Sequence, residues 1–192
     1  MNDYGRNIER QKMKARDTYK KLLNLNKFKF VGPLPQTLTY KDFENDILTK
    51  VEDEKMKNKA IYSVTEKADG ERFLLLIGED GETQLFPRNI DHDDDFRKIQ
   101  LWEHDLKFQK TDVNIILDGE FVKDNFYVFD LLVMRRADMR SLDFSQRLKE
   151  LKMFFDHHEG NLQTKFNIHL KNFRGMKKSD ISIYQHADTI WK

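Results

Sequence analysis

The sequence predicts an α+β fold, in which helices flank a β-sheet. The first observation is a series of short apolar runs bounded by glycine, asparagine or acidic turn signals, which is typical of strands. These runs lie at 60–64, 73–77, 83–86, 113–117, 126–133 and 166–173. The second observation is a set of segments whose apolar residues recur at helical spacing. These segments lie at 1–26, 39–51, 96–106 and 141–155.

The composition of the 192-residue chain limits its function classes. Its 34 Lys and Arg nearly balance its 33 Asp and Glu, so any contact with nucleic acid must come from a local patch. The absence of cysteine excludes disulfides and thiolate metal sites and fits a reducing compartment. No apolar run is long enough to span a bilayer, and the N-terminus is too polar for a secretory signal. We therefore expect a soluble intracellular protein with no membrane partner.

Residues 1–27 are predicted to form a helical extension, because Ile8, Tyr19 and Leu22 recur at roughly helical spacing. Its lysines and arginines could contact RNA, but a solvated charged face is the expected interpretation. The following stretch F-K-F-V-G-P-L-P breaks the helix, because a glycine and two prolines enforce an extended, turning course. This divides the chain into an extension, 1–27, and a core domain, 28–192.

Caps and turns mark the ends of other predicted elements. Thr39 can cap the helix over 39–51, and Ser141 can cap the helix that carries Phe144, Leu148 and Leu151. The sequence E-D-G-E before the third apolar run predicts a hairpin turn between two strands.

Two clusters resemble metal ligands at first sight. The acidic sequence D-H-D-D-D at 91–95 is more typical of a solvated loop or of a helix N-terminus. His157 and His158 lie near the predicted end of a helix, where the helix dipole explains them better than a metal ion does. Neither cluster is predicted to bind a metal.

Lys67 lies between two predicted strands, 60–64 and 73–77. Gly70 follows at once, and a glycine there allows either a positive φ or a backbone without a Cβ that would obstruct a ligand. A lysine fixed at such a bend is a candidate nucleophile if its pKa is lowered, and the neighbouring cation Arg72 favours that. The alternative is a hairpin with an ordinary surface lysine.

Other charged residues interrupt the apolar strands. Glu120 follows the run 113–117, and Asp130 lies inside a run so apolar that its carboxylate needs a partner. Arg72 and Arg88 are suited to phosphate oxygens, and carboxylates can hold Mg²⁺ together with substrate phosphates. A lysine close to an α-phosphorus could attack it, form a phosphoamide and release pyrophosphate.

Three motifs, in order and at matching separations, resemble those of the covalent nucleotidyltransferases, which are the mRNA capping guanylyltransferases and the ATP-dependent polynucleotide ligases. K-A-D-G-E-R at 67–72 is similar to the hallmark K-x-D-G-x-R. L-D-G-E-F at 117–121 and F-Y-V-F-D-L at 126–131 are similar to the second and third motifs. The resemblance implies an antiparallel β-sheet nucleotidyltransferase core, ATP-grasp-like or DNA ligase-like, with flanking helices.

The resemblance is nearer to capping enzymes, especially those of large DNA viruses. Ala68 follows the lysine where ligases usually have an aromatic residue. The sequence V-G-P-L-P at 31–35 is similar to the Gly-x-x-Pro-Val segment of capping domains, although Gln36 stands where valine is usual. This implies an mRNA guanylyltransferase that takes GMP from GTP with Mg²⁺ or Mn²⁺. It would form a covalent lysyl-N-GMP intermediate and transfer GMP to the 5′ diphosphate end of RNA.

The resemblance also implies roles for single residues. Lys67 is the expected catalytic nucleophile, and Glu120 is expected to contact the ribose or the metal ion. Phe129 is expected to stack on the base, with Tyr127 as the alternative, and Asp69 shapes the turn and assists near the metal. The nucleotide-binding residues implied in this way are Glu66, Asp69, Arg72, Arg88, Glu120 and Phe129.

Two further motifs and the C-terminal OB-fold domain of the family are not visible in the sequence. We therefore expect a partial nucleotidyltransferase domain over 28–192, from a fragment, a truncated product or one piece of a split protein, with slow or no activity by itself. Other capping domains or subunits are expected partners, and the expected location is the cytoplasm, the nucleus or a viral factory. The alternatives are a DNA or RNA ligase adenylation domain, or a non-catalytic remnant that acts as a binding module.

Overall fold

The computed structural model describes residues 3–34, 39, 41, 63–102, 113–158 and 167–175. The chain divides into two compact units. The first unit consists of Met1–Gly32 and Ala68–Lys171, and the second consists of Pro33–Lys67 and Asn172–Lys192. The helix predicted over 39–51 lies outside the described residues, apart from its positions 39 and 41.

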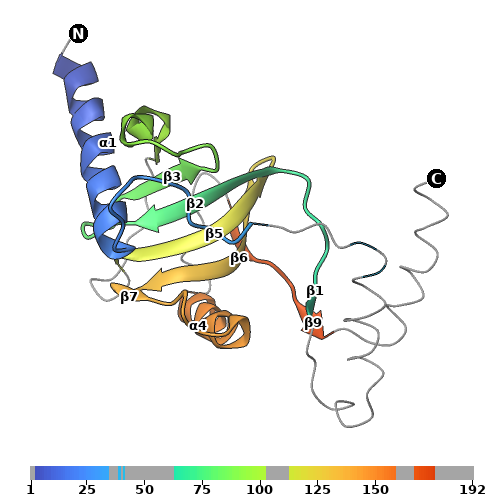
Figure 1. The fold of residues 1–192 in the computed structure, drawn as a ribbon. Coiled ribbons are helices and arrows are strands. Elements are labelled where there is room, and N and C mark those ends of the chain that lie inside the picture. Colours follow the sequence, from blue (N-terminus) through green and yellow to red (C-terminus); the bar gives the residue numbers. More distant parts are fainter. Residues whose placement is uncertain are drawn as a thin grey trace. The chain divides into compact units, whose positions relative to one another are not determined.

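The first unit is built on a seven-stranded sheet in the order β4-β3-β2-β5-β6-β7, with β8 paired to β6 (Figure 1). All neighbouring strands are antiparallel except β6 and β8, which are parallel. The strands are β2 Glu71–Ile77, β3 Thr83–Pro87, β4 Gln100–Trp102, β5 Ile115–Val122, β6 Asn125–Met134, β7 Ala137–Asp138 and β8 Asn167–Leu170. The α+β class with an antiparallel sheet is therefore confirmed.

The hairpin predicted between β2 and β3 is present, and its Gly81 has the positive φ of 81° that favours glycine. The strand predicted to end at Leu117 continues to Val122, because pairing with β2 on one side and β6 on the other carries it through the D-G-E sequence. In the segment 96–106, predicted as a helix, residues 96–98 are instead the end of a 3₁₀ helix, η3 Asp93–Lys98, and β4 follows at Gln100–Trp102, while 103–106 lie outside the described residues.

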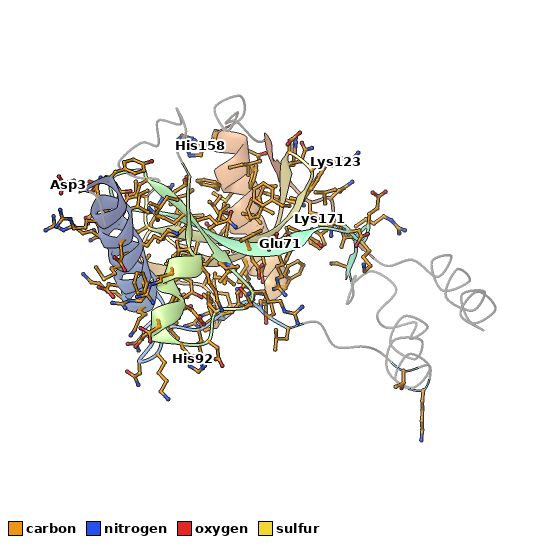
Figure 2. All side chains as sticks on the ribbon, turned by 90° about the horizontal axis from the view of Figure 1, so that it is seen from above. Asp3, Glu71, His92, Lys123, His158 and Lys171 are labelled. Atoms are coloured by element: carbon orange, nitrogen blue, oxygen red, sulfur yellow. The ribbon has the colours of Figure 1, made fainter. Side chains whose placement is uncertain are left out.

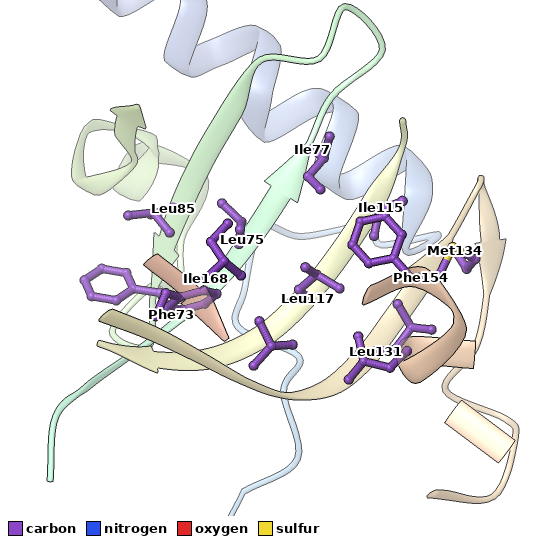
Figure 3. Close-up of a cluster of buried hydrophobic side chains, with 13 residues drawn as sticks. Phe73, Leu75, Ile77, Leu85, Ile115, Leu117, Leu131, Met134, Phe154 and Ile168 are labelled. Atoms are coloured by element: carbon purple, nitrogen blue, oxygen red, sulfur yellow. The ribbon is translucent and has the colours of Figure 1, made fainter. Parts of the chain in front are cut away.

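One face of the sheet is covered by α4, Phe144–His157. Leu151 and Phe154 of this helix join a core cluster with inward residues of the strands, such as Leu75 and Leu117 (Figure 3). The helix begins after Asp143 and not after the predicted cap Ser141, because Asp143 and Gln146 form a capping box. His157 ends the helix and His158 is its C-cap, as the dipole interpretation requires.

The other face is covered by α1, Asp3–Leu22, and by the chain that follows it. Tyr19 is fully buried, stacks on Phe86 of β3 with ring centroids 4.5 Å apart, and donates a hydrogen bond to the Lys29 carbonyl oxygen. Phe96 of η3 belongs to the core cluster on this face, whereas the buried residues of α4 belong to the cluster on the other face, so α4 and η3 lie on opposite sides of the sheet. The N-terminal helix is therefore confirmed, while the domain boundary after residue 27 stays a prediction. Within the described residues no helix combines the length and apolarity that crossing a bilayer requires.

The acidic cluster forms the start of η3, as expected for a helix N-terminus. Asp95 accepts hydrogen bonds from the backbone N–H groups of Asp91 and His92. It also pairs with Lys98, and this interaction is the main cause that lowers the pKa of Asp95 to about 2. Asp93 accepts from Lys20 and from the Phe28 N–H, which connects η3 to α1 and its following loop.

The second unit contains a two-stranded antiparallel ribbon of β1, Ser63–Val64, and β9, Arg174–Gly175. The Thr65 hydroxyl donates to the Asn172 carbonyl oxygen at 2.8 Å beside this ribbon. The described residues of the strand before Lys67, 63–64, therefore pair with β9 and not with β2, so they do not form the hairpin predicted around Lys67, and the role of this lysine stays a prediction.

Candidate nucleotide-binding site

Four side chains form a row across the sheet of the first unit. In the strand register Arg72 of β2 faces Glu120 of β5, Glu120 faces Tyr127 of β6, and Tyr127 faces His169 of β8. Directly opposed residues project from the same side of a sheet, and strands lie ~4.8 Å apart, so this transverse row spans about 14 Å. It lies on the side of the sheet that α1 covers, since Leu74, two residues after the arginine, belongs to the α1 core cluster.

Arg72 is held in place from three sides. Its Nε and Nη2 donate to the two carboxylate oxygens of Asp118 at 2.9 Å and 2.6 Å. Its guanidinium also lies 5.2 Å from the ring centroids of both Phe30 and Phe129. A guanidinium has five N–H groups in a planar fork, so the arginine keeps donors for a ribose or phosphate oxygen.

Asp118 is the site residue that sequence reasoning missed. It has 0% exposure, and burial raises its pKa to about 6 against the opposing effect of the Arg72 hydrogen bonds. The signal was available, because Asp118 is a carboxylate at the end of an apolar run, two residues before Glu120. The argument that a buried carboxylate needs a partner applies to it as well as to Asp130.

Asp130 has the partner that its burial requires. Arg147 of α4 donates to both carboxylate oxygens of Asp130, at 2.8 Å and 2.9 Å. This interaction is the main cause that raises the pKa of Arg147. Asp130 therefore links β6 to α4.

Gly70 and Glu120 connect the motif segment to β5. The Gly70 N–H donates to Glu120 Oε1 at 3.0 Å. A Cβ at Gly70 would lie 1.8 Å from the carbonyl oxygen of Phe121, so no side chain fits there. Among the described glycines Gly81 is the one with a positive φ. The close approach of the β5 backbone therefore excludes a side chain at Gly70, and the positive φ considered from the sequence is not the reason for this glycine.

Phe129 occupies a β-bulge, since Asp118 faces Asp130 while Gly119 faces Val128. Its half-buried ring lies near the guanidinium of Arg72 and 5.8 Å from Nζ of Lys171, so it contacts two cations. Stacking of Phe129 on a base stays a prediction.

The remaining predicted residues are exposed. Arg88 follows directly on Pro87, which faces Phe73 in the register of β2 and β3. Asp69 belongs to the first unit, while Glu66 and the catalytic candidate Lys67 belong to the second. Arg72, Glu120 and Phe129 are thus brought together on one face of the sheet, and the roles of all these residues stay predictions.

The transverse row contains one carboxylate that can serve as a ligand of a divalent cation, that of Glu120. In the described part of the chain no three His, Asp or Glu side chains gather as a set of metal ligands. Mg²⁺ usually binds through one or two carboxylates together with substrate phosphates, and a carboxylate that accepts one hydrogen bond keeps further lone pairs. Glu120 therefore fits a metal ion that arrives with a nucleotide, whereas Asp118 is engaged by Arg72.

A groove of about 770 Å³ lies elsewhere in the first unit, between α1 and the strands β3 and β4. Lys14, Asp80 and Gln84 are among its lining residues, and none of the predicted site residues is.

Comparison with known proteins agrees with the motifs. The family described as mRNA capping enzyme, catalytic domain, matches residues 4–184. A probable mRNA-capping enzyme of Acanthamoeba polyphaga mimivirus is 27% identical over an alignment of 140 residues, and the match covers 68% of this chain and 11% of the relative. A solved structure titled Pmar-Lig_Pre. is 15% identical with a TM-score of 0.44, over 66% of this chain and 35% of that one. The chain thus spans about a tenth of its curated relative. Since the family match covers nearly the whole sequence, the chain belongs to the mRNA capping enzyme catalytic domain family.

Proposed function

We propose that the chain provides the guanylyltransferase step of mRNA capping through Lys67. The neutral Lys67 amine attacks the α-phosphorus of GTP, the bond to the bridging oxygen breaks, and pyrophosphate leaves as the amine loses a proton. A terminal oxygen of a 5′ diphosphate RNA then attacks the same phosphorus and breaks the P–N bond. The lysine is released, and GMP is joined to the RNA.

The observation that supports this proposal most is the strand register, in which Arg72 of β2 lies directly opposite Glu120 of β5. Asp118 and two aromatic rings fix the guanidinium, so the cation is oriented before a nucleotide arrives. Preorganised donors of this kind stabilise charge that develops during the reaction. Glu120 is the proposed ligand of a ribose hydroxyl or of the Mg²⁺ ion that neutralises the phosphates.

Covalent labelling tests the proposal. The chain is incubated with Mg²⁺ and α-labelled GTP or ATP, and label that survives denaturation is measured. We expect label from GTP that is lost in Lys67→Ala and retained in Lys149→Ala, a variant of an exposed lysine on α4. Label from ATP alone would support a ligase adenylation domain instead. Absence of label from both nucleotides would contradict catalysis by this chain and support the binding module.

A further inference from the structure

Tyr127 and His169 form an aromatic surface at the end of the transverse row. Their rings are stacked, with centroids 5.4 Å apart and planes 28° apart. Nε2 of His169 lies 3.0 Å from Oδ1 of Asn125, which fixes the imidazole ring. His169 is exposed and Tyr127 is half-buried, so the pair is oriented by the protein and open to solvent.

The surface continues the candidate site without a break. Tyr127 faces Glu120 directly in the register, so the stacked rings begin one strand, ~4.8 Å, from the carboxylate. His169 lies one strand further, on the parallel strand β8. A nucleotide next to one held at Arg72 and Glu120 would therefore reach the stacked rings.

A lysine side chain, that of Lys171, supplies positive charge near these aromatic rings. Lys171, labelled in Figure 2, follows β8 and donates its N–H to the Val128 carbonyl oxygen at 2.7 Å, and its Nζ lies 5.8 Å from the ring centroid of Phe129. Aromatic platforms beside cations are the usual means of binding single-stranded nucleic acid without regard to sequence.

The basic helix α1 is a weaker candidate for RNA. Its Lys14 pairs with Asp80 at 3.1 Å, and its Lys20 pairs with Asp93 at 3.0 Å. Acidic residues of the β2–β3 hairpin and of η3 thus partly neutralise the lysines of this helix.

We propose that the Tyr127–His169 stack binds a base at the 5′ end of the RNA that accepts GMP. The 5′ diphosphate of this RNA extends along the transverse row toward Glu120 and Arg72. This inference rests on the proposed guanylyltransferase function. Every base has a π face, so the platform accepts any first base.

The experiment separates RNA binding and GMP transfer from enzyme–GMP formation. Binding of a 3′-labelled 5′ diphosphate oligoribonucleotide is followed by fluorescence anisotropy, and transfer is followed by chasing preformed enzyme–GMP with the same RNA. For His169→Ala we expect RNA affinity to fall about tenfold or more, the usual loss when a base loses an aromatic partner. Transfer at subsaturating RNA falls by a similar factor, and by more than enzyme–GMP formation does.

Two further variants make the outcome specific. His169→Phe keeps an aromatic ring and is expected to restore RNA binding, whereas His157→Ala removes an exposed histidine on α4 and is expected to change neither step. Unchanged RNA affinity in His169→Ala would overturn the inference. A larger loss in enzyme–GMP formation than in transfer would also overturn the inference, because the rings would then bind GTP and not the base of the RNA. If the unaltered chain forms no enzyme–GMP, the proposed function fails, while the anisotropy measurement still decides the inference.

Discussion

A buried carboxylate, Asp118, fixes the arginine on which the candidate site depends. Its two oxygens accept from Arg72, whose guanidinium also contacts the rings of Phe30 and Phe129. Removing a carboxylate from water is costly, and a paired cation offsets that cost only partly. The pKa of Asp118 is raised because burial, its largest cause, outweighs the opposing effect of the Arg72 hydrogen bonds. The orientation of the arginine is therefore obtained at the expense of stability.

This balance predicts a pH dependence for Asp118. Its pKa is about 6 in the fold and about 3.9 in an unfolded chain, so the folded state binds more protons between these values. The unfolding free energy of the unaltered chain, relative to Asp118→Asn, should fall by roughly 2–3 kcal/mol as pH rises from about 4 to 6. Urea unfolding of both proteins at several pH values measures this difference. A difference that is constant with pH would contradict the assignment.

Gly70 gives a second prediction for a single residue. A Cβ at this position meets the Phe121 carbonyl oxygen at 1.8 Å, and backbone cannot move aside as a flexible side chain can. Gly70→Ala should therefore cost ~1–3 kcal/mol or more in unfolding free energy and reduce covalent labelling. Gly78→Ala is the matched control, since a Cβ there meets the carboxylate end of the Glu82 side chain, which can rotate away. Equal stability of the two variants would show that β5 does not constrain Gly70.

The strands show how far local sequence determines this fold. The runs 73–77, 83–86 and 126–133 lie within β2, β3 and β6, because apolar residues between turn signals are a local property. The helix predicted over 96–106 is wrong at 100–102, since β4 forms there by pairing with β3, an interaction between distant residues that helical spacing does not reveal. The same reason applies to Asp118, whose partner lies 46 residues away.

The connection between β6 and α4 depends on one ion pair. Arg147→Met should lower the unfolding free energy by ~3–5 kcal/mol, because it leaves the Asp130 charge buried without its partner. Urea unfolding measures this loss, and Lys149→Met, an exposed change on the same helix, should stay within about 0.5 kcal/mol. The double variant with Asp130→Leu should recover part of the loss, since both charges are then absent. No recovery would mean that Arg147 acts mainly through packing.

In the molecule as a whole, the N-terminal helix belongs to the same compact unit as the sheet. The family match begins at residue 4, near the first residue of α1. Sequence spacing predicted the helix but suggested an extension, because most of its residues are charged or polar. Burial of Tyr19 against Phe86 depends on residues distant in sequence, so periodicity alone could not reveal it.

If α1 is part of the first unit, removing its main anchor should destabilise the sheet. Tyr19→Ala should lower the unfolding free energy by ~3–5 kcal/mol, the usual cost of deleting a buried aromatic side chain. Tyr4→Ala is the matched control, because Tyr4 lies on the same helix with 71% exposure and should change stability by about 0.5 kcal/mol or less. Urea unfolding followed by near-ultraviolet circular dichroism measures both variants. Equal stabilities would mean that 1–27 is a separable extension, whereas the expected difference would mean that the sheet requires α1 for its stability.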